Sequence, residues 1–173
     1  AKQIESLQGI MDTASYGAVL NSPRARLLID HRHLTLSVNL SDIKNPILIH
    51  ENDTEVELAA QGNLSLRLRD GKRMKSIYAE GIMHFNAQKI AWPVCLRVRK
   101  SGDYIYLPNK DGKPKKRKLG AYFNDQSTPL SLREQRIVLC DAEERIIGIL
   151  GQRVDARFTP KPNAPTLELR WKA

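Results

Sequence analysis

The chain of 173 residues lacks any long hydrophobic run. No stretch approaches the roughly 18 consecutive apolar residues that suggest a membrane-spanning helix. The N-terminal residues also lack a basic segment followed by an apolar run, so the sequence predicts no signal peptide. With 41% hydrophobic and 27% charged residues, the composition is typical of a soluble globular protein of one ordinary domain or two small ones.

Cysteine is scarce as well, since the chain has only Cys95 and Cys140. Two cysteines do not make a disulfide framework in a chain of this length. Each lies inside an apolar run, so we expect two buried, unpaired thiols. Reduced cysteines of this kind are typical of a cytoplasmic protein.

Glycine-rich phosphate loops and nucleophile-elbow motifs are missing, and the ten glycines are scattered at turns. A loop that cradles a nucleotide needs glycines because its backbone amides must close around phosphate. The sequence therefore predicts no catalytic residues and no cofactor site within these residues, and no tight binding of ATP.

Residues that hold metals are also few. Asp53, Glu55 and Glu57 alternate along a predicted strand, which favours a solvated strand face over a calcium or acid–base cluster. The four histidines lack a third ligand at a recognisable spacing, so we expect ordinary surface histidines and no metal site. They are His31, His33, His50 and His84.

The hydrophobic period changes along the chain. Residues 2–12 place apolar side chains at helical spacing and predict a short amphipathic helix. Alternating apolar and polar residues between about 16 and 85 predict antiparallel strands and hairpins. Further strands are predicted at 94–99, 104–107, 136–140, 145–150 and 166–171, a short helix at 119–125, and a helix start at Thr128–Pro129 with a capping box at Ser131–Glu134.

These elements predict an α+β protein that is mainly β, with an antiparallel core and short helices. We expect an N-terminal helix with a β-rich connecting module over residues 1–85 and a C-terminal domain over 86–173, which pack as two lobes or as one unit. In the strand at 94–99, Arg97 and Arg99 are expected to project from the same face.

The net charge of +9 is concentrated in one segment. Residues 85–140 hold 12 Lys and Arg against 4 Asp and Glu, whereas residues 1–84 hold 10 of each. A local excess of this kind predicts a polyanionic partner. The sequence has no basic amphipathic helix of the kind that binds membrane surfaces, so nucleic acid is the favoured partner over a membrane.

The most basic run, at residues 109–118, is predicted to be a polar loop. Alone it indicates no more than a solubilising turn. Its neighbours strengthen the prediction of RNA binding, because cations for phosphates and planar rings occur together there. The aromatic residues fit either base stacking or a half-buried core, and the core is favoured; they are Tyr104, Tyr106, Tyr122 and Phe123.

An ordered set of short motifs between residues 92 and 158 resembles the C-terminal domain of the tRNA(Ile)-lysidine synthetases. A basic strand leads into a Gly-Asp turn, and a Lys-Leu pair and an aromatic short helix follow. A Pro-x-x-x-Arg and two strands come next, before a closing G-x-R-x-x-x-R-F. The matching residues are Arg97, Gly102–Asp103, Lys118–Leu119, Phe123–Asn124–Asp125, Pro129, Arg133, Val138–Leu139, Asp141, Ile146–Ile147, Gly151, Arg153 and Arg157–Phe158.

The resemblance implies a β-sandwich-like fold shared with a domain of the phenylalanyl-tRNA synthetase β chain. It further implies the tRNA-binding part of a ligase that converts the wobble cytidine of an isoleucine tRNA to lysidine. ATP, magnesium and lysine are then expected at an N-terminal catalytic domain with an S-G-G-x-D-S motif, which these 173 residues do not contain. The alternatives are a stand-alone RNA- or ribosome-binding module and, less favoured, a small β-rich enzyme.

The expected partner is thus tRNA(Ile), held by its acceptor stem and body. The expected tRNA-binding residues combine the basic segment with the arginines of the family motif. They are Arg97, Arg99, Lys113, Lys115, Lys116, Arg117, Lys118, Arg133, Arg136, Arg153 and Arg157.

Overall fold

The structure is a computed structural model that describes residues 19–21, 25–29, 34–38, 46–58, 63–69 and 81–172. Within these ranges no helix is long and apolar enough to cross a membrane. The helix predicted for residues 2–12, together with His31 and His33, lies outside the described residues.

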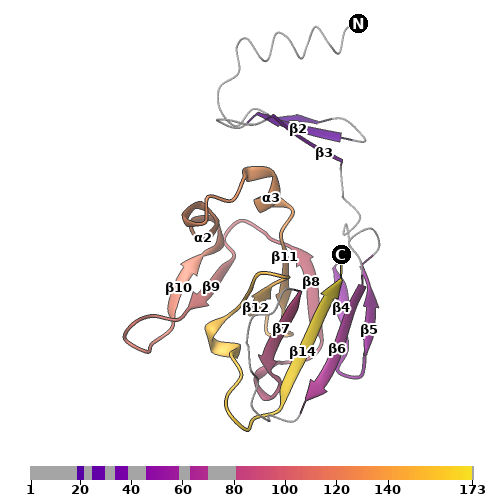
Figure 1. The fold of residues 1–173 in the computed structure, drawn as a ribbon, viewed down its shortest axis with the longest axis vertical. Helices are drawn as coiled ribbons and strands as arrows, with labels where there is room; N and C mark the ends of the chain where they lie inside the picture. Colours follow the sequence, from indigo (N-terminus) through magenta and orange to yellow (C-terminus); the bar gives the residue numbers. More distant parts are fainter. Residues whose placement is uncertain are drawn as a thin grey trace, which may run out of the picture.

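The first strands form a small antiparallel sheet. They are β1 (Val19–Asn21), β2 (Ala25–Ile29) and β3 (Leu34–Val38), in the order β1-β2-β3. Leu27 lies opposite both Leu20 and Leu36 in the register. This sheet appears beside the main body of the protein in Figure 1. The strands predicted in this part of the chain are confirmed where it is described.

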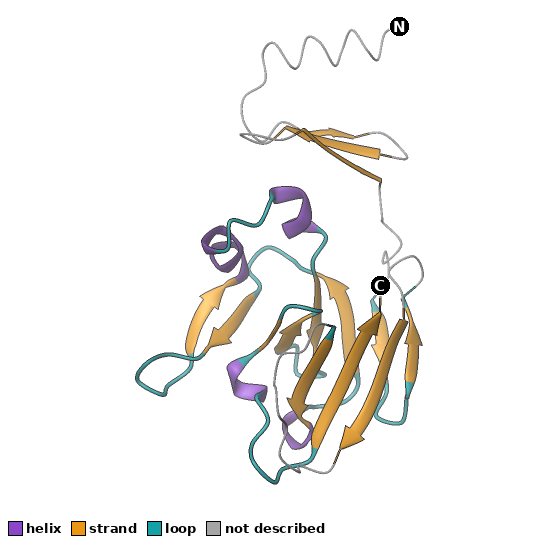
Figure 2. Ribbon diagram, viewed as in Figure 1, coloured by secondary structure: helices purple, strands orange, loops and turns teal. Residues whose placement is uncertain are grey.

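The main body is a sandwich of two antiparallel sheets (Figures 1 and 2). The five-stranded sheet has the order β13-β12-β11-β8-β4 and the four-stranded sheet has the order β5-β6-β14-β7. The first contains β4 (Ile47–Ile49), β8 (Val94–Val98), β11 (Ile137–Cys140), β12 (Ile146–Ile149) and β13 (Arg153–Val154). The second contains β5 (Glu55–Glu57), β6 (Asn63–Arg69), β7 (Ile82–Asn86) and β14 (Thr166–Lys172).

The first hydrophobic core lies between these sheets. Leu96 and Leu139 enter it from the five-stranded sheet, and Phe85 and Leu169 enter it from the four-stranded sheet. All four side chains are buried. Because alternate residues of a strand point to opposite faces, the alternation read from the sequence places these residues in the sandwich. The prediction of a mainly β, antiparallel sandwich with short helices is confirmed.

Strands from both halves of the chain share the two sheets. β14 lies between β6 and β7, and β4 pairs with β8. The boundary expected near residue 85 therefore falls at the end of β7, next to the 3-10 helix η2 (Ala87–Lys89). Hydrogen bonding between strands joins residues on both sides of it.

A third layer covers the other face of the five-stranded sheet. It consists of the hairpin β9 (Tyr104–Leu107) and β10 (Lys115–Lys118) with the helices α2 (Leu119–Asp125) and α3 (Leu130–Glu134). Beneath it lies a second core that contains Ile105 of β9, Leu119 and Phe123 of α2, and Val138 and Ile149 of the sheet. The five-stranded sheet is thus buried on both faces.

The two ends of the third layer's helices differ in how well the sequence predicted them. α2 occupies residues 119–125, as predicted. The capping box predicted for α3 is wrong, because the helix begins at Leu130 with Pro129 as its N-cap and no side-chain cap hydrogen bond. Proline fixes the backbone before the first turn, so the turn forms without a hydroxyl cap.

The two cysteines are free and lie opposite each other on β8 and β11. Cys140 is buried as predicted, whereas Cys95 is only half-buried. The neighbouring edge strand β4 is three residues long and leaves Leu48, the register partner of Cys95, 54% exposed. Burial raises the pKa of the Cys140 thiol to about 11, which makes its reactive thiolate scarce at neutral pH.

His84 is a correction to the expectation of surface histidines, because it is buried in the four-stranded sheet. Its Nε2 lies 3.4 Å from an oxygen of Glu168. Arg69 and Arg170 donate to the same carboxylate at 3.1 and 2.7 Å. Burial acts to raise the pKa of Glu168, but hydrogen bonds from Arg170, Arg69 and His84 together lower it to about 2.

This depressed pKa predicts an acid-sensitive contribution to stability. The ionised Glu168 is favoured in the folded state, so it stabilises the fold above the pKa of about 4.5 expected for an exposed glutamate. That contribution is lost as pH falls toward about 2. Urea unfolding at pH 6, 4 and 2.5 is expected to show wild type more stable than Glu168→Gln, by a margin that shrinks with acidification. An equal margin at all three values would contradict this role.

Candidate nucleic-acid interface

The basic run of the sequence forms half of the β9–β10 hairpin. Lys118 lies opposite Tyr104 and Lys116 opposite Tyr106, whereas Arg117 lies opposite Ile105. Since residues opposite each other share a face, one face carries the two tyrosines with Lys116 and Lys118. Ile105 on the other face is fully buried in the second core. The tyrosine face is therefore the outer face of the hairpin.

The prediction of a loop over residues 109–118 is only half correct. Residues 115–118 are the strand β10, which has too few apolar residues to show a strand pattern in the sequence. Hydrogen bonding to β9 decides its structure. The remaining loop turns at Gly112, where φ is +73°, and its amide donates to the Asn109 carbonyl at 3.0 Å. Residues 108–116 are all exposed apart from Pro108's neighbour Leu107 at the strand end.

The hairpin thus presents lysines to solvent over its whole length. Lys113 lies in the loop, and Lys115, Lys116 and Lys118 lie on β10; all four are exposed. Lys110 is a further exposed cation at the tip that the list of expected residues omitted. Exposed ammonium groups spaced along a strand suit contacts to successive phosphates of a nucleic-acid backbone.

Aromatic rings and cations alternate across the outer face. The Lys116 ammonium lies 3.7 Å from the centre of the Tyr104 ring. The Tyr104 and Tyr106 rings meet edge to face, with centroids 5.9 Å apart. The guanidinium of Arg157 lies 4.1 Å from the centre of the Tyr106 ring. Both tyrosines are half-buried.

Arg157 is held in this position by Asp155, which is fully buried just before the 3-10 helix η3 (Ala156–Phe158). Two guanidinium nitrogens of Arg157 donate to the Asp155 carboxylate at 3.0 and 2.9 Å. The same carboxylate accepts the backbone amide of Tyr106 at 2.8 Å. Asp155 therefore fixes the hairpin and Arg157 together.

Arg97, in contrast, is bound within the protein. Its guanidinium makes two hydrogen bonds to Asp103, at 2.8 and 2.9 Å. The side chains are 17% and 11% exposed, so this pair braces the turn between β8 and β9. Burial acts to raise the pKa of Asp103, but hydrogen bonds from Arg97 and from the Lys100 amide hold it below its usual value.

Three more arginines of the expected set anchor the helices. Arg99 donates to the carbonyl of Arg133 at 2.7 Å, and Arg133 itself donates to Thr128 and Asn124. Arg117 on the inner face of the hairpin pairs with Asp125 of α2. These arginines hold α2, α3 and the hairpin to each other.

The expected site residues therefore lie in one layer but fall into two groups. The four lysines and Arg157 line the outer face or the tip of the hairpin, whereas Arg97, Arg99, Arg117 and Arg133 make contacts inside the layer. Arg136 before β11 and Arg153 on β13 are half-buried. The platform of Tyr104 and Tyr106 was missed because their face is set by the register with β10. The shared parity of the tyrosines with Lys116 and Lys118 was the available signal.

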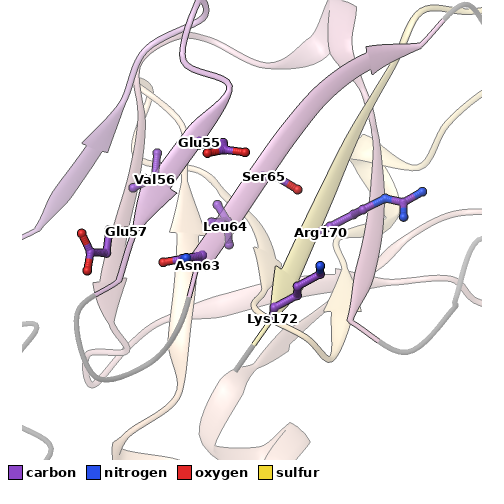
Figure 3. A pocket seen from close by; sticks show the side chains of 8 residues that line it. All are labelled: Glu55, Val56, Glu57, Asn63, Leu64, Ser65, Arg170 and Lys172. Atoms are coloured by element: carbon purple, nitrogen blue, oxygen red, sulfur yellow. The ribbon is translucent and has the colours of Figure 1, made fainter.

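A second hollow of about 560 Å³ lies on the four-stranded sheet (Figure 3). Glu55 and Glu57 line one side, and Arg170 and Lys172 on β14 line the other. Acidic and basic groups balance there, so a polyanion is not favoured. In the described part of the chain, no group of three or more His, Cys, Asp or Glu is arranged to hold a metal ion.

The fold and the hairpin define a β-sandwich domain with a third layer that presents a basic, aromatic face. Residues 94–171 match the family model of the TilS substrate C-terminal domain. TilS is the lysidine synthetase that the motifs in the sequence resemble. This chain contains the C-terminal region of that family.

A solved structure shows the same fold. It is described as the crystal structure of a TILS C-terminal domain, and it matches with a TM-score of 0.59 at 17% sequence identity. The match covers 75% of this chain and 98% of that chain. No curated protein matches the chain.

Proposed function

We propose that this chain binds tRNA through the outer face of the β9–β10 hairpin. The exposed lysines on that face are the observation that carries the proposal. The family match supports it, since a TilS C-terminal region relates the chain to an ATP-dependent tRNA ligase. The nearly neutral composition of residues 1–84 leaves the hairpin layer as the cationic part of the protein.

The finer parts of the proposal follow from the family. The tRNA is the isoleucine tRNA whose wobble cytidine becomes lysidine, and its acceptor stem and body lie against the hairpin. ATP, magnesium and lysine serve a catalytic domain of the full-length cytoplasmic enzyme. The chain described here supplies binding and orientation, which place the reacting nucleotide far more often at a distant catalytic site.

Salt dependence tests the proposal. If three or four lysines contact phosphates, affinity for a tRNA transcript is expected to fall with a log–log salt slope of about −2 to −4. Fluorescence anisotropy at several salt concentrations measures this slope. Absence of binding at low salt, or an affinity that does not change with salt, would contradict the proposal. Competition between the isoleucine tRNA and other tRNAs then tests the finer part.

A further inference from the structure

Tyr104 is the aromatic residue of the hairpin that is oriented but lightly covered. Its ring is half-exposed and meets Tyr106 at an interplanar angle of 74°. The ammonium that lies over the ring belongs to Lys116, which is itself exposed. An exposed lysine on a four-carbon stem moves easily, so it is a removable cover.

Tyr106 provides the fixed support for this ring. Arg157 lies over Tyr106 at 4.1 Å and is tied to the buried Asp155 by two hydrogen bonds. The backbone of Tyr106 is bound to the same carboxylate at 2.8 Å. Tyr104 therefore keeps its orientation when Lys116 moves away, and little conformational freedom remains to be lost on binding.

Exchange of Lys116 for a nucleic-acid base is favourable on typical magnitudes. A cation–π contact of an exposed lysine changes an equilibrium by about two- to fivefold. A base stacked on an aromatic side chain changes binding by about five- to 150-fold. The displaced ammonium keeps its charge and is free to contact a phosphate of the same strand.

We propose that Tyr104 stacks an unpaired base of the RNA that lies along the hairpin. The base must be unpaired because bases within a duplex are already stacked on both sides, whereas single-stranded ends and loops leave a face open. This inference rests on the proposed function, and it adds a preference for RNA with a single-stranded segment beside a helix. The hairpin lysines hold the backbone, and Tyr104 recognises the open base.

Two RNA duplexes of the same sequence test this inference, one blunt and one with a short single-stranded extension. Tyr104→Leu is expected to weaken binding of the extended duplex by about 10-fold and to leave binding of the blunt duplex unchanged. Tyr104→Phe keeps the ring and is expected to bind like wild type. Lys116→Gln is the matched control, because loss of a phosphate contact weakens binding of both duplexes alike.

The outcomes separate this inference from the proposed function. If wild type binds neither duplex, the proposed function fails. If wild type binds both, but Tyr104→Leu weakens both equally or neither, stacking by Tyr104 is overturned while the hairpin remains an RNA-binding surface. A measurement on wild type alone guards against misfolding of the variant. The fluorescence of 2-aminopurine placed in the extension is expected to fall on binding, and an unchanged signal would overturn the inference.

Discussion

Replacement of Lys115, Lys116 and Lys118 by alanine is expected to lower the affinity for tRNA by about two orders of magnitude at about 0.15 M salt. Each lysine–phosphate contact adds about 0.7–0.9 to the log–log salt slope, so the slope is expected to flatten by about 2 to 3. The loss is expected to be similar for all tRNAs, because phosphate contacts position a nucleic acid without reading its bases. Anisotropy titrations at several salt concentrations measure both quantities.

A matched control removes the same charge elsewhere. Arg67 and Lys172 are exposed on the four-stranded sheet, and Lys161 is exposed in the loop before β14. The alanine variant of these three has the same net charge as the hairpin variant, and its affinity is expected to change little. If the control variant loses as much affinity as the hairpin variant, binding reflects overall charge and the hairpin is only a soluble turn. Arg117 is left intact in both because its pairing with Asp125 is structural.

Phe123→Ala is expected to lower the free energy of unfolding by about 3–5 kcal/mol. The Phe123 ring is fully buried in the second core, where it meets the Tyr122 ring at 5.4 Å and lies under the Arg99 guanidinium. Truncation leaves a cavity between α2 and the sheet that rigid strands on two sides do not close. Urea denaturation followed by circular dichroism measures the loss.

Leu132 on α3 provides the comparison, since it is 47% exposed. Leu132→Ala is expected to change stability by about 0.5 kcal/mol or less. Similar unfolding midpoints for Phe123→Ala and wild type would mean that the second core does not hold the third layer. The account of a hairpin positioned by this core would then be wrong.

Strands with apolar alternation were predictable from the sequence to within a residue. The strands expected at 136–140 and 166–171 are β11 and β14, and the helix expected at 119–125 is α2. Their side chains are sorted between core and solvent by a local pattern that is visible in the sequence. β10 was missed because all four of its residues are basic, and only its pairing with β9 makes it a strand.

The site was predictable as a segment but not as a surface. The charge excess located the hairpin layer, yet Arg97 and Lys118 look alike in a sequence. Whether a cation is bound inside or exposed depends on partners such as Asp103 and Asp125, which the fold brings near. His84 shows the same limit over a longer distance, because its partner Glu168 lies 84 residues away.

Amide hydrogen exchange with and without tRNA tests the central claim most directly. The account predicts that bound tRNA slows exchange in β9, β10 and the loop between them, while β5, β6 and the exposed end of β14 exchange as in the free protein. Slower exchange along β5 and β6, with the hairpin unchanged, would contradict it and would place the RNA on the four-stranded sheet.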